Sequence, residues 1–150
     1  MENVDDFVLC NNEISSIIEF TTPNTDGDTT YTWTNDNTSI GLSSSGNGDI
    51  PSFTAINLNP ITEVATITVT PTYENNGVVC IGDPQTFSIS VLSEIEISGL
   101  TVDALDCNDP NSGNINITVT GGSGVYDFLW SNGAITEDLN NIGPGDYSVT

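Results

Sequence analysis

The sequence contains no lysine, arginine or histidine, whereas 21 of its 150 residues are Asp or Glu, so the formal net charge at neutral pH is -21. Binding to nucleic acid or to an anionic membrane surface requires cationic side chains, so both partner classes are excluded. The missing histidine and lysine also remove the usual proton shuttle, the Schiff-base nucleophile and every Ser-His-Asp or Cys-His arrangement. Only a carboxylate pair could act as a catalyst, as in a glycosidase, and no cleft signature accompanies the acids. We therefore expect a protein that is not an enzyme.

Long apolar runs are missing as well. No stretch approaches the roughly 18 apolar residues that a membrane helix needs. The first residues, MENVDD, lack the basic and apolar regions of a signal peptide, so targeting signals are expected outside this sequence. Without cationic side chains no salt bridge between side chains can form, and we expect the carboxylates to make a solvated shell that keeps the protein monomeric.

The sequence does contain many short segments in which apolar and polar residues alternate, separated by clusters of Gly, Pro, Asn, Asp and Ser. In the clearest of them, Ala65, Ile67 and Val69 alternate with threonines, which is typical of a strand with one buried face. No helical periodicity is present. The expected strands cover residues 7–9, 14–20, 29–34, 40–42, 53–58, 63–73, 78–80 and 87–91, then 115–119, 126–130 and a run that starts at 147. These observations predict an all-β fold.

Two parts of the chain resemble each other. The pentapeptide YTWTN at 31–35 is similar to FLWSN at 128–132, and TITVT at 66–70 is similar to NITVT at 116–120. The strand spacing and turn clusters predict two tandem β-sandwich modules of the Ig-like kind, residues 1–92 and 93–150. Because the strand-like residues 94–97 follow the first module directly, a short linker and an elongated arrangement are expected.

The second module has its own pattern of turns. The Gly121-Gly122-Ser123-Gly124 segment lies between two alternating runs and predicts a hairpin. The last alternating run starts at Tyr147 and stops at Thr150, so we expect this module to be truncated at its C-terminus and the chain to be a piece of a longer protein. The large rings, which recur at strand spacing, are expected in the core. These rings are Tyr31, Trp33, Phe128 and Trp130.

The series ITVTGGSGVYDFLWSNGAITEDLNNIGPGDYSVT resembles the repeat of giant gliding-motility adhesins of the SprB type, which occur in tandem on the surfaces of Bacteroidetes. Those repeats have the pattern TVTGG-x-x-PY-x-x-x-WSNG, then T-x-x-(I/L), a G-x-Y-x-V-T strand and a late Asn-Gly-Cys. The chain follows this pattern up to the G-x-Y-x-V-T strand, with Val125 where proline is common. Residues 1–92 resemble the PKD-like domains of the same adhesins through the Y-x-W strand, the ITVTPTY strand and the C-x-G-x-P-x-x-F-x-I-x-V ending.

The resemblance implies a non-catalytic stalk segment of a large cell-surface adhesin that acts in surface adhesion and gliding and is exported by the type IX secretion pathway. The implied location is extracellular, on the outer-membrane surface. The implied partners are neighbouring repeats of the same chain and, through other domains, a surface polysaccharide. A carbohydrate-binding β-sandwich is the alternative, because exposed aromatic rings would form a sugar platform.

The sequence has three cysteines, at positions 10, 80 and 107. In a secreted protein, Cys10 and Cys80 would lie at the two ends of one module, and a disulfide between them would stabilise it by roughly 4 kcal/mol in the chain-entropy model. The family pattern implies that Cys107 pairs with the late Asn-Gly-Cys. Alternatively, all three are free thiols. Zinc is disfavoured because there is no histidine and no C-x-x-C pair.

Calcium is the cofactor that the acidic residues could bind, because it prefers oxygen ligands closely spaced in loops. Two stretches qualify: Asp26 with Asp28, and Asp103 with Asp106 and Asp109. Neither stretch is an EF-hand loop. Asp and Gly are also expected in plain turns, so turns without a metal remain the alternative.

Overall fold

The computed structural model describes residues 1–103 and 105–150, and the protein is all-β, as predicted. It divides into two compact units, Met1–Glu94 and Ile95–Thr150, which are described separately below. The predicted boundary between residues 92 and 93 falls inside strand β6 (Gln85–Asp103), whose first part belongs to the first unit. No helix among the described residues is long and apolar enough to cross a membrane.

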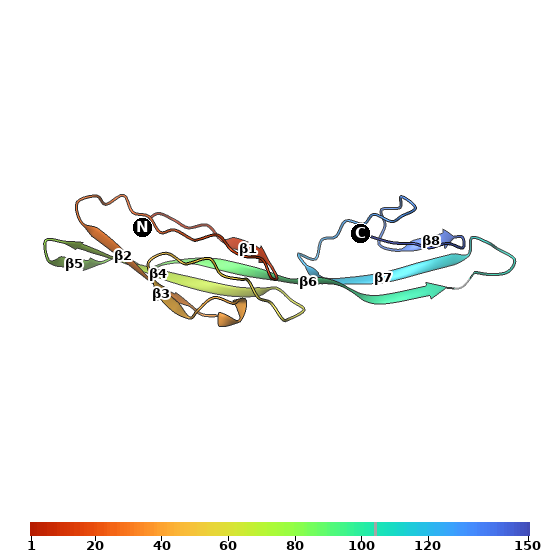
Figure 1. Cartoon of the computed structure of the whole chain (residues 1–150), viewed down its shortest axis with the longest axis horizontal. Helices are drawn as coiled ribbons and strands as arrows, with labels where there is room; N and C mark the ends of the chain where they lie inside the picture. The colour runs from red at the N-terminus through yellow and green to blue at the C-terminus, as the bar shows by residue number, and fades with distance from the viewer. Residues whose placement is uncertain (104) are drawn as a thin grey trace. The chain divides into compact units, whose positions relative to one another are not determined.

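The first unit is built on one sheet (Figure 1). Its hydrogen-bonded neighbours follow the order β3-β2-β4-β6, and three of these strands are β2 (Asp28–Asn35), β3 (Ser45–Asn47) and β4 (Glu63–Asn75). Strand β1 (Phe7–Cys10) pairs with β6 in parallel, and β5 (Val78–Ile81) pairs with the end of β4. The alternating segment around Ile67 thus became the central strand, because it has a neighbour on each side.

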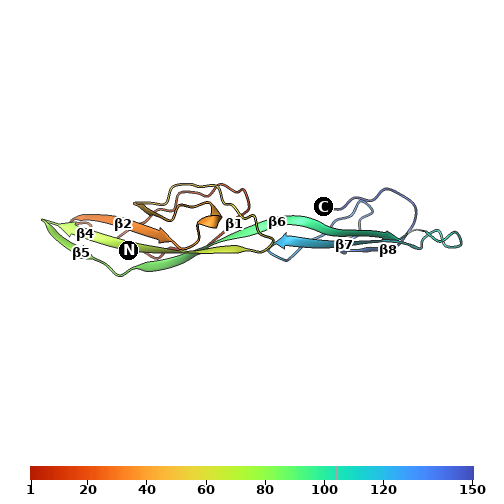
Figure 2. The ribbon, with the colours of Figure 1, turned by 90° about the horizontal axis from the view of Figure 1, so that it is seen from below.

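The second layer of this unit consists of irregular segments that lie over one face of the sheet (Figure 2). They touch one another through isolated bridges, Ile14 with Thr54 and Ile18 with Ile50. The core between the layers contains residues from both, and its members are Leu9, Ile18, Phe20, Tyr31, Trp33, Ile40, Leu42, Ile50, Ala55, Ala65, Ile67, Val69, Phe87, Ile89 and Val91. The arrangement is sandwich-like, and whether the unit is PKD-like stays a prediction.

Three of the strands expected in the first unit are not regular strands. Residues 14–20 and 53–58 make only the isolated bridges, and the expected strand at 40–42 is wrong because η1 (Thr38–Ile40) is a 3-10 helix. Asn37 precedes η1, and its side chain accepts a hydrogen bond from the Ser39 amide. A side chain that caps an amide in this way competes with strand pairing. Local alternation therefore predicted the burial of Ile40 but not its 3-10 helical backbone conformation.

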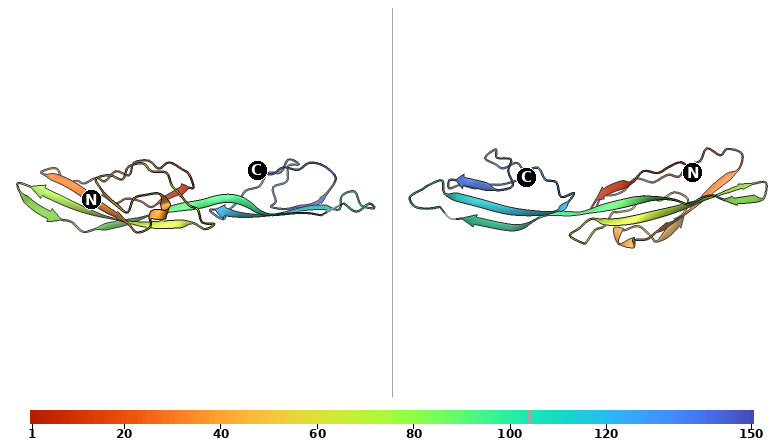
Figure 3. Two further views of the ribbon diagram at one scale, coloured as in Figure 1. Left: turned by 60° about the horizontal axis from the view of Figure 1, so that its bottom comes forward. Right: turned by 180° about the vertical axis from the view of Figure 1, so that it is seen from behind.

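The second unit has the sheet order β6-β7-β8, with β7 (Gly113–Gly122) and β8 (Leu139–Ile142). Apart from β8, the chain that follows β7 lies on one side of this sheet (Figure 3). It contains two short segments that bridge each other at Trp130 and Val149 and form the opposing layer. Ile117, Trp130 and Leu139 are the buried centre of this unit.

The expected hairpin at residues 121–124 is wrong. β7 pairs with β8, and the aromatic segment 126–130 pairs with residues 148–150 instead. Gly121, Gly122 and Gly124 have φ values of 91°, 58° and 77°, which a left-handed turn requires. The turn carries the chain from one layer to the other, so the glycines were recognised correctly as a turn but not as a connection between layers.

Candidate functional site

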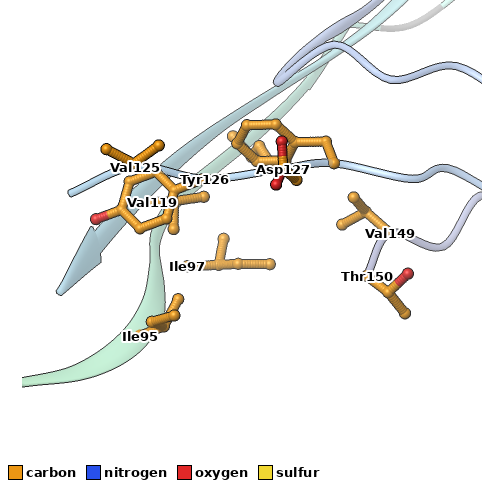
Figure 4. Close-up of a pocket in the computed structure, with 10 residues that line it drawn as sticks. Ile95, Ile97, Val119, Val125, Tyr126, Asp127, Val149 and Thr150 are labelled. Atoms are coloured by element: carbon orange, nitrogen blue, oxygen red, sulfur yellow. The ribbon is translucent and has the colours of Figure 1, made fainter. Parts of the chain in front are cut away.

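The second unit contains an open apolar groove of about 340 Å³ between its two layers. One wall comes from the sheet, where Ile95 and Ile97 lie on β6, and the other comes from the segments that carry Tyr126, Phe128 and Val149. Figure 4 shows Ile95, Ile97 and Val149 around one shared space. The full lining is Ile95, Ile97, Ile117, Val119, Val125, Tyr126, Asp127, Phe128, Val149 and Thr150.

The groove exposes apolar side chains that a finished core would cover. Ile95 and Ile97 are 61% and 55% exposed, and Val125 is 81% exposed. Single exposed apolar residues are ordinary, but several that line one depression are typical of a binding surface. Asp127 is the only ionisable acid or base in the lining apart from the Tyr126 phenol. The groove can therefore bury apolar groups, and nothing in its lining suits acid–base chemistry.

The outer wall of the groove is held by a short antiparallel ladder. Leu129 donates its amide to the Thr150 carbonyl (2.9 Å) and accepts from the Thr150 amide (3.1 Å), and the Ser131 amide donates to Ser148 (2.8 Å). Trp130 and Val149 face each other between these contacts. In the first unit, Trp33 faces Val69 in the β2–β4 ladder, with Thr34 opposite Thr68 and Thr32 opposite Thr70. The two units therefore share one Trp–Val register, which agrees with the similarity of their sequences.

The aromatic rings do not form an exposed platform. Trp33 and Trp130 are each 4% exposed and Tyr31 is 7% exposed, so the core positions expected for them are confirmed. The Trp130 indole N–H donates to the Thr136 carbonyl at 2.7 Å, which fixes the ring in place. Phe128 is half-buried against the core of the second unit.

The acids at 103–109 do not converge on a common point. Asp103 accepts from the Asn114 side chain (3.3 Å), while Asp106 and Asp109 accept from the amides of Asn108 and Asn111, two residues further on (2.9 and 3.0 Å). These contacts are those of ordinary Asx turns. In the part of the chain that the structure describes, no three Asp, Glu, Cys or His residues gather as metal ligands. Because calcium takes six to eight oxygens, the residues present do not fit it.

Asp26 and Asp28 also lie apart from any such group. Asp28 opens β2 and faces Glu74 of β4, and both side chains are exposed. Two carboxylates directly opposite each other repel. Asp26 is exposed in the preceding turn. The calcium expectation here stays a prediction, and the described geometry supplies no site for it.

The structure does not bring Cys10 and Cys80 together. Cys10 pairs with Leu92 of β6. The preceding residue of β6 pairs with Glu63, the first residue of β4. Cys80 faces Tyr73, ten positions further along β4. That length of strand spans roughly 33 Å, whereas a disulfide needs Cα atoms within about 7 Å. Both thiols are free and exposed, as is that of Cys107. The expected disulfide between Cys10 and Cys80 is absent because β5 folds back on β4, which holds Cys80 away from β1.

Two carboxylates are fixed by hydrogen bonds in the first unit. The side chains of Asn37, Asn59 and Ser39 donate to Glu63 and hold its pKa below the ordinary value; Asn37 donates at 2.8 Å and Ser39 at 3.2 Å. The Ser88 amide donates to Asp6 at 2.7 Å and lowers its pKa in the same way. Both groups join neighbouring segments, so their role is structural.

Sequence reasoning missed the groove. The alternation of Ile95 and Ile97 was visible and predicted a strand, and both do lie in β6. Alternation marks the apolar face of a strand, but it does not show whether another element covers that face. The repeated Trp and Val positions were the available signal, because they show which segments pair.

In a comparison with known families, residues 100–135 match the SprB repeat. These residues include β7 and the whole aromatic segment 126–130. The match confirms the resemblance of the second part of the chain and indicates a repeat segment of the cell-surface adhesin type, a structural repeat not known for catalysis. No curated protein and no solved structure matches the chain.

Proposed function

We propose that this chain is a non-catalytic stalk segment of a large cell-surface adhesin that serves surface attachment and gliding. The observation that carries the proposal is the match of residues 100–135 to the SprB repeat. The family is one of extracellular surface repeats, so the stalk would lie outside the cell, on an adhesin anchored at the outer membrane and exported by the type IX pathway. Its partners would be neighbouring repeats of the same protein, while other domains grip a polysaccharide.

The chemistry of the surface supports a spacer role. With a net charge of -21 and no cationic side chain, copies of the chain repel one another, which favours a monomer. The absence of Lys and Arg leaves a trypsin-like protease no bond to cleave. The described hydrogen bonds of the acids are made to turns and neighbouring strands, as with Glu63 and Asp109, and not to one another in a reactive pair.

The carbohydrate-binding alternative is weaker because no aromatic ring among the described residues is fully exposed. A sugar platform requires rings with an accessible face, and the buried Trp33 and Trp130 cannot stack on a sugar without unfolding. Acrylamide quenching measures this directly. We expect shielded tryptophan emission from the folded protein, and ready quenching would favour the sugar-binding function.

The cellular role can be tested with antibodies raised against residues 1–150. We expect them to label intact cells, and an in-frame deletion of this segment to reduce attachment and gliding while the rest of the adhesin is still exported. Labelling that appears only after permeabilisation would contradict the surface location. A deletion strain that glides and attaches normally would contradict the motility role.

A further inference from the structure

The segment that carries Val149 has one paired edge and one open edge. Its carbonyl and amide groups at Ser148 and Thr150 bond to the segment at Leu129 and Ser131. In an extended chain the intervening residues, Tyr147 and Val149, direct their backbone groups to the opposite side. None of residues 1–103 or 105–150 makes a backbone hydrogen bond to that side.

The first unit shows what covers the equivalent edge. There the strand that faces Trp33, β4, is covered on its other side by β6, which runs antiparallel to it. Val69 lies opposite Gln85, and Ile67 opposite Phe87. The covering strand supplies three core side chains, Phe87, Ile89 and Val91, with exposures of 5%, 0% and 0%. In this unit the Trp–Val ladder is thus completed by a strand whose alternate residues are apolar.

The groove of the second unit lies at the Thr150 end of this segment, because Val149 and Thr150 line it and Tyr147 does not. In the register of the first unit, the positions of Gln85 and Phe87 in an added strand would lie opposite Val149 and Tyr147. The lining is apolar apart from Asp127 and the polar atoms of Tyr126 and Thr150, and the strand that plays this part in the first unit, residues 85–92, carries no charge.

We propose that the open edge at Tyr147 and Val149 takes one antiparallel strand of the same kind as Gln85–Val91, supplied by the same protein from a segment outside residues 1–150. The shared Trp–Val register sets where this strand pairs. A second copy of the chain is a poor donor, because it brings its own -21 charge and its residues 85–91 are already paired. The inference rests on the ladders and not on the role in adhesion.

The test is a lengthened protein in which a copy of residues 71–92, with Cys80 replaced by serine, follows Thr150. Thr150 occupies the register position of Thr70, so the appended strand can reach the edge as it does in the first unit. We expect the amides of Tyr147 and Val149 to exchange with deuterium at about a tenth of their rate in the 150-residue protein, or more slowly. The reason is that hydrogen-bonded amides exchange only when the pairing opens. Two-dimensional NMR of the full protein reads both amides.

The matched control carries the same extension with serine at its copies of Phe87, Ile89 and Val91. Slower exchange with the apolar extension and not with the serine control supports the proposal. Equal exchange with and without the apolar extension would overturn it. Sedimentation of the 150-residue protein as a dimer that Ile97→Asp dissociates would overturn it in favour of a second copy.

Discussion

Trp33 lies directly opposite Gly46 in the ladder between β2 and β3, and its indole ring fills the space that a side chain on Gly46 would occupy. A Cβ at this position would overlap ring atoms of the indole. The ring is buried and belongs to the core of the first unit, so it has little room to move. Glycine is needed here for close approach.

Replacing Gly46 with alanine should therefore destabilise the first unit. Overpacking of this kind costs about 1–3 kcal/mol, and we expect the urea midpoint of Gly46→Ala to fall accordingly. Ser45→Ala is the matched control, because Ser45 is exposed beside it on the same strand. Equal midpoints for the two variants would show that the indole can shift at no cost.

The facing acids Asp28 and Glu74 predict a stabilising substitution. Glu74→Gln removes one charge of a directly opposed pair, and the expected gain in the free energy of unfolding is about 0.5 kcal/mol or less, because both groups are exposed. The gain should vanish in about 1 M salt, where the screening length is only about 3 Å. Asp83→Asn, an exposed acid in a loop, controls for the change in net charge. A gain that persists at high salt would mean that repulsion is not its cause.

Much of the fold of the first unit could be predicted, because its central strands bury one face. Ala65, Ile67 and Val69 are fully buried, as their alternation with threonine indicated. Residues 53–58 show the limit of that reasoning. Ala55 and Asn57 are buried there, but the Asn57 side chain donates to the carbonyls of Ile61 and Val91, and the Asn57 amide donates to a side chain. Hydrogen bonds to side chains take the place of regular strand pairing at residues 53–58. The alternation of apolar and polar residues alone cannot show this.

The site was less predictable than the fold, because it depends on contacts between distant segments. The disulfide between Cys10 and Cys80 was inferred from positions along the chain, whereas the fold-back of β5 decides the distance between them. The calcium sites were inferred from acidic spacing, but Asp106 and Asp109 accept bonds within their own turns. Pairing across the sheet is set by long-range packing, which residue spacing does not specify.

Stability should depend on pH through Glu63. Its pKa is lowered in the folded state from an ordinary value of 4.5, because three side chains donate to it. The ionised form therefore stabilises the fold above about pH 4.5, and this contribution is lost as the pH falls through the lower folded pKa. Glu63→Gln should be less stable than the parent at pH 7, and the difference should shrink as the pH falls below 4.5.

Urea unfolding at pH 7 and at several lower values measures this difference. Glu137→Gln, which removes an exposed charge in the second unit, is the control and should show no comparable loss at pH 7. A Glu63→Gln penalty that stays constant down to pH 3 would mean that the loss comes from packing and not from the carboxylate.

Calcium should act on this protein only as a diffuse counterion. Because no three ligating side chains gather among the described residues, calcium and magnesium at equal concentration should raise the melting temperature by similar small amounts through screening. Scanning calorimetry with each ion, then with EGTA, measures this. A rise specific to calcium that saturates at a defined stoichiometry, and that Asp106→Asn abolishes, would instead establish a built site.

The Trp–Val register that both units share has a consequence for biogenesis. Two neighbouring stretches of one nascent polypeptide offer interchangeable ladders, so a strand of the later one can mispair with the earlier one while both are unfolded. Vectorial emergence from the ribosome would suppress this exchange, because the earlier stretch closes before its rival is present. Refolding of the intact chain from denaturant lacks that protection and should yield a kinetically trapped, strand-swapped fraction.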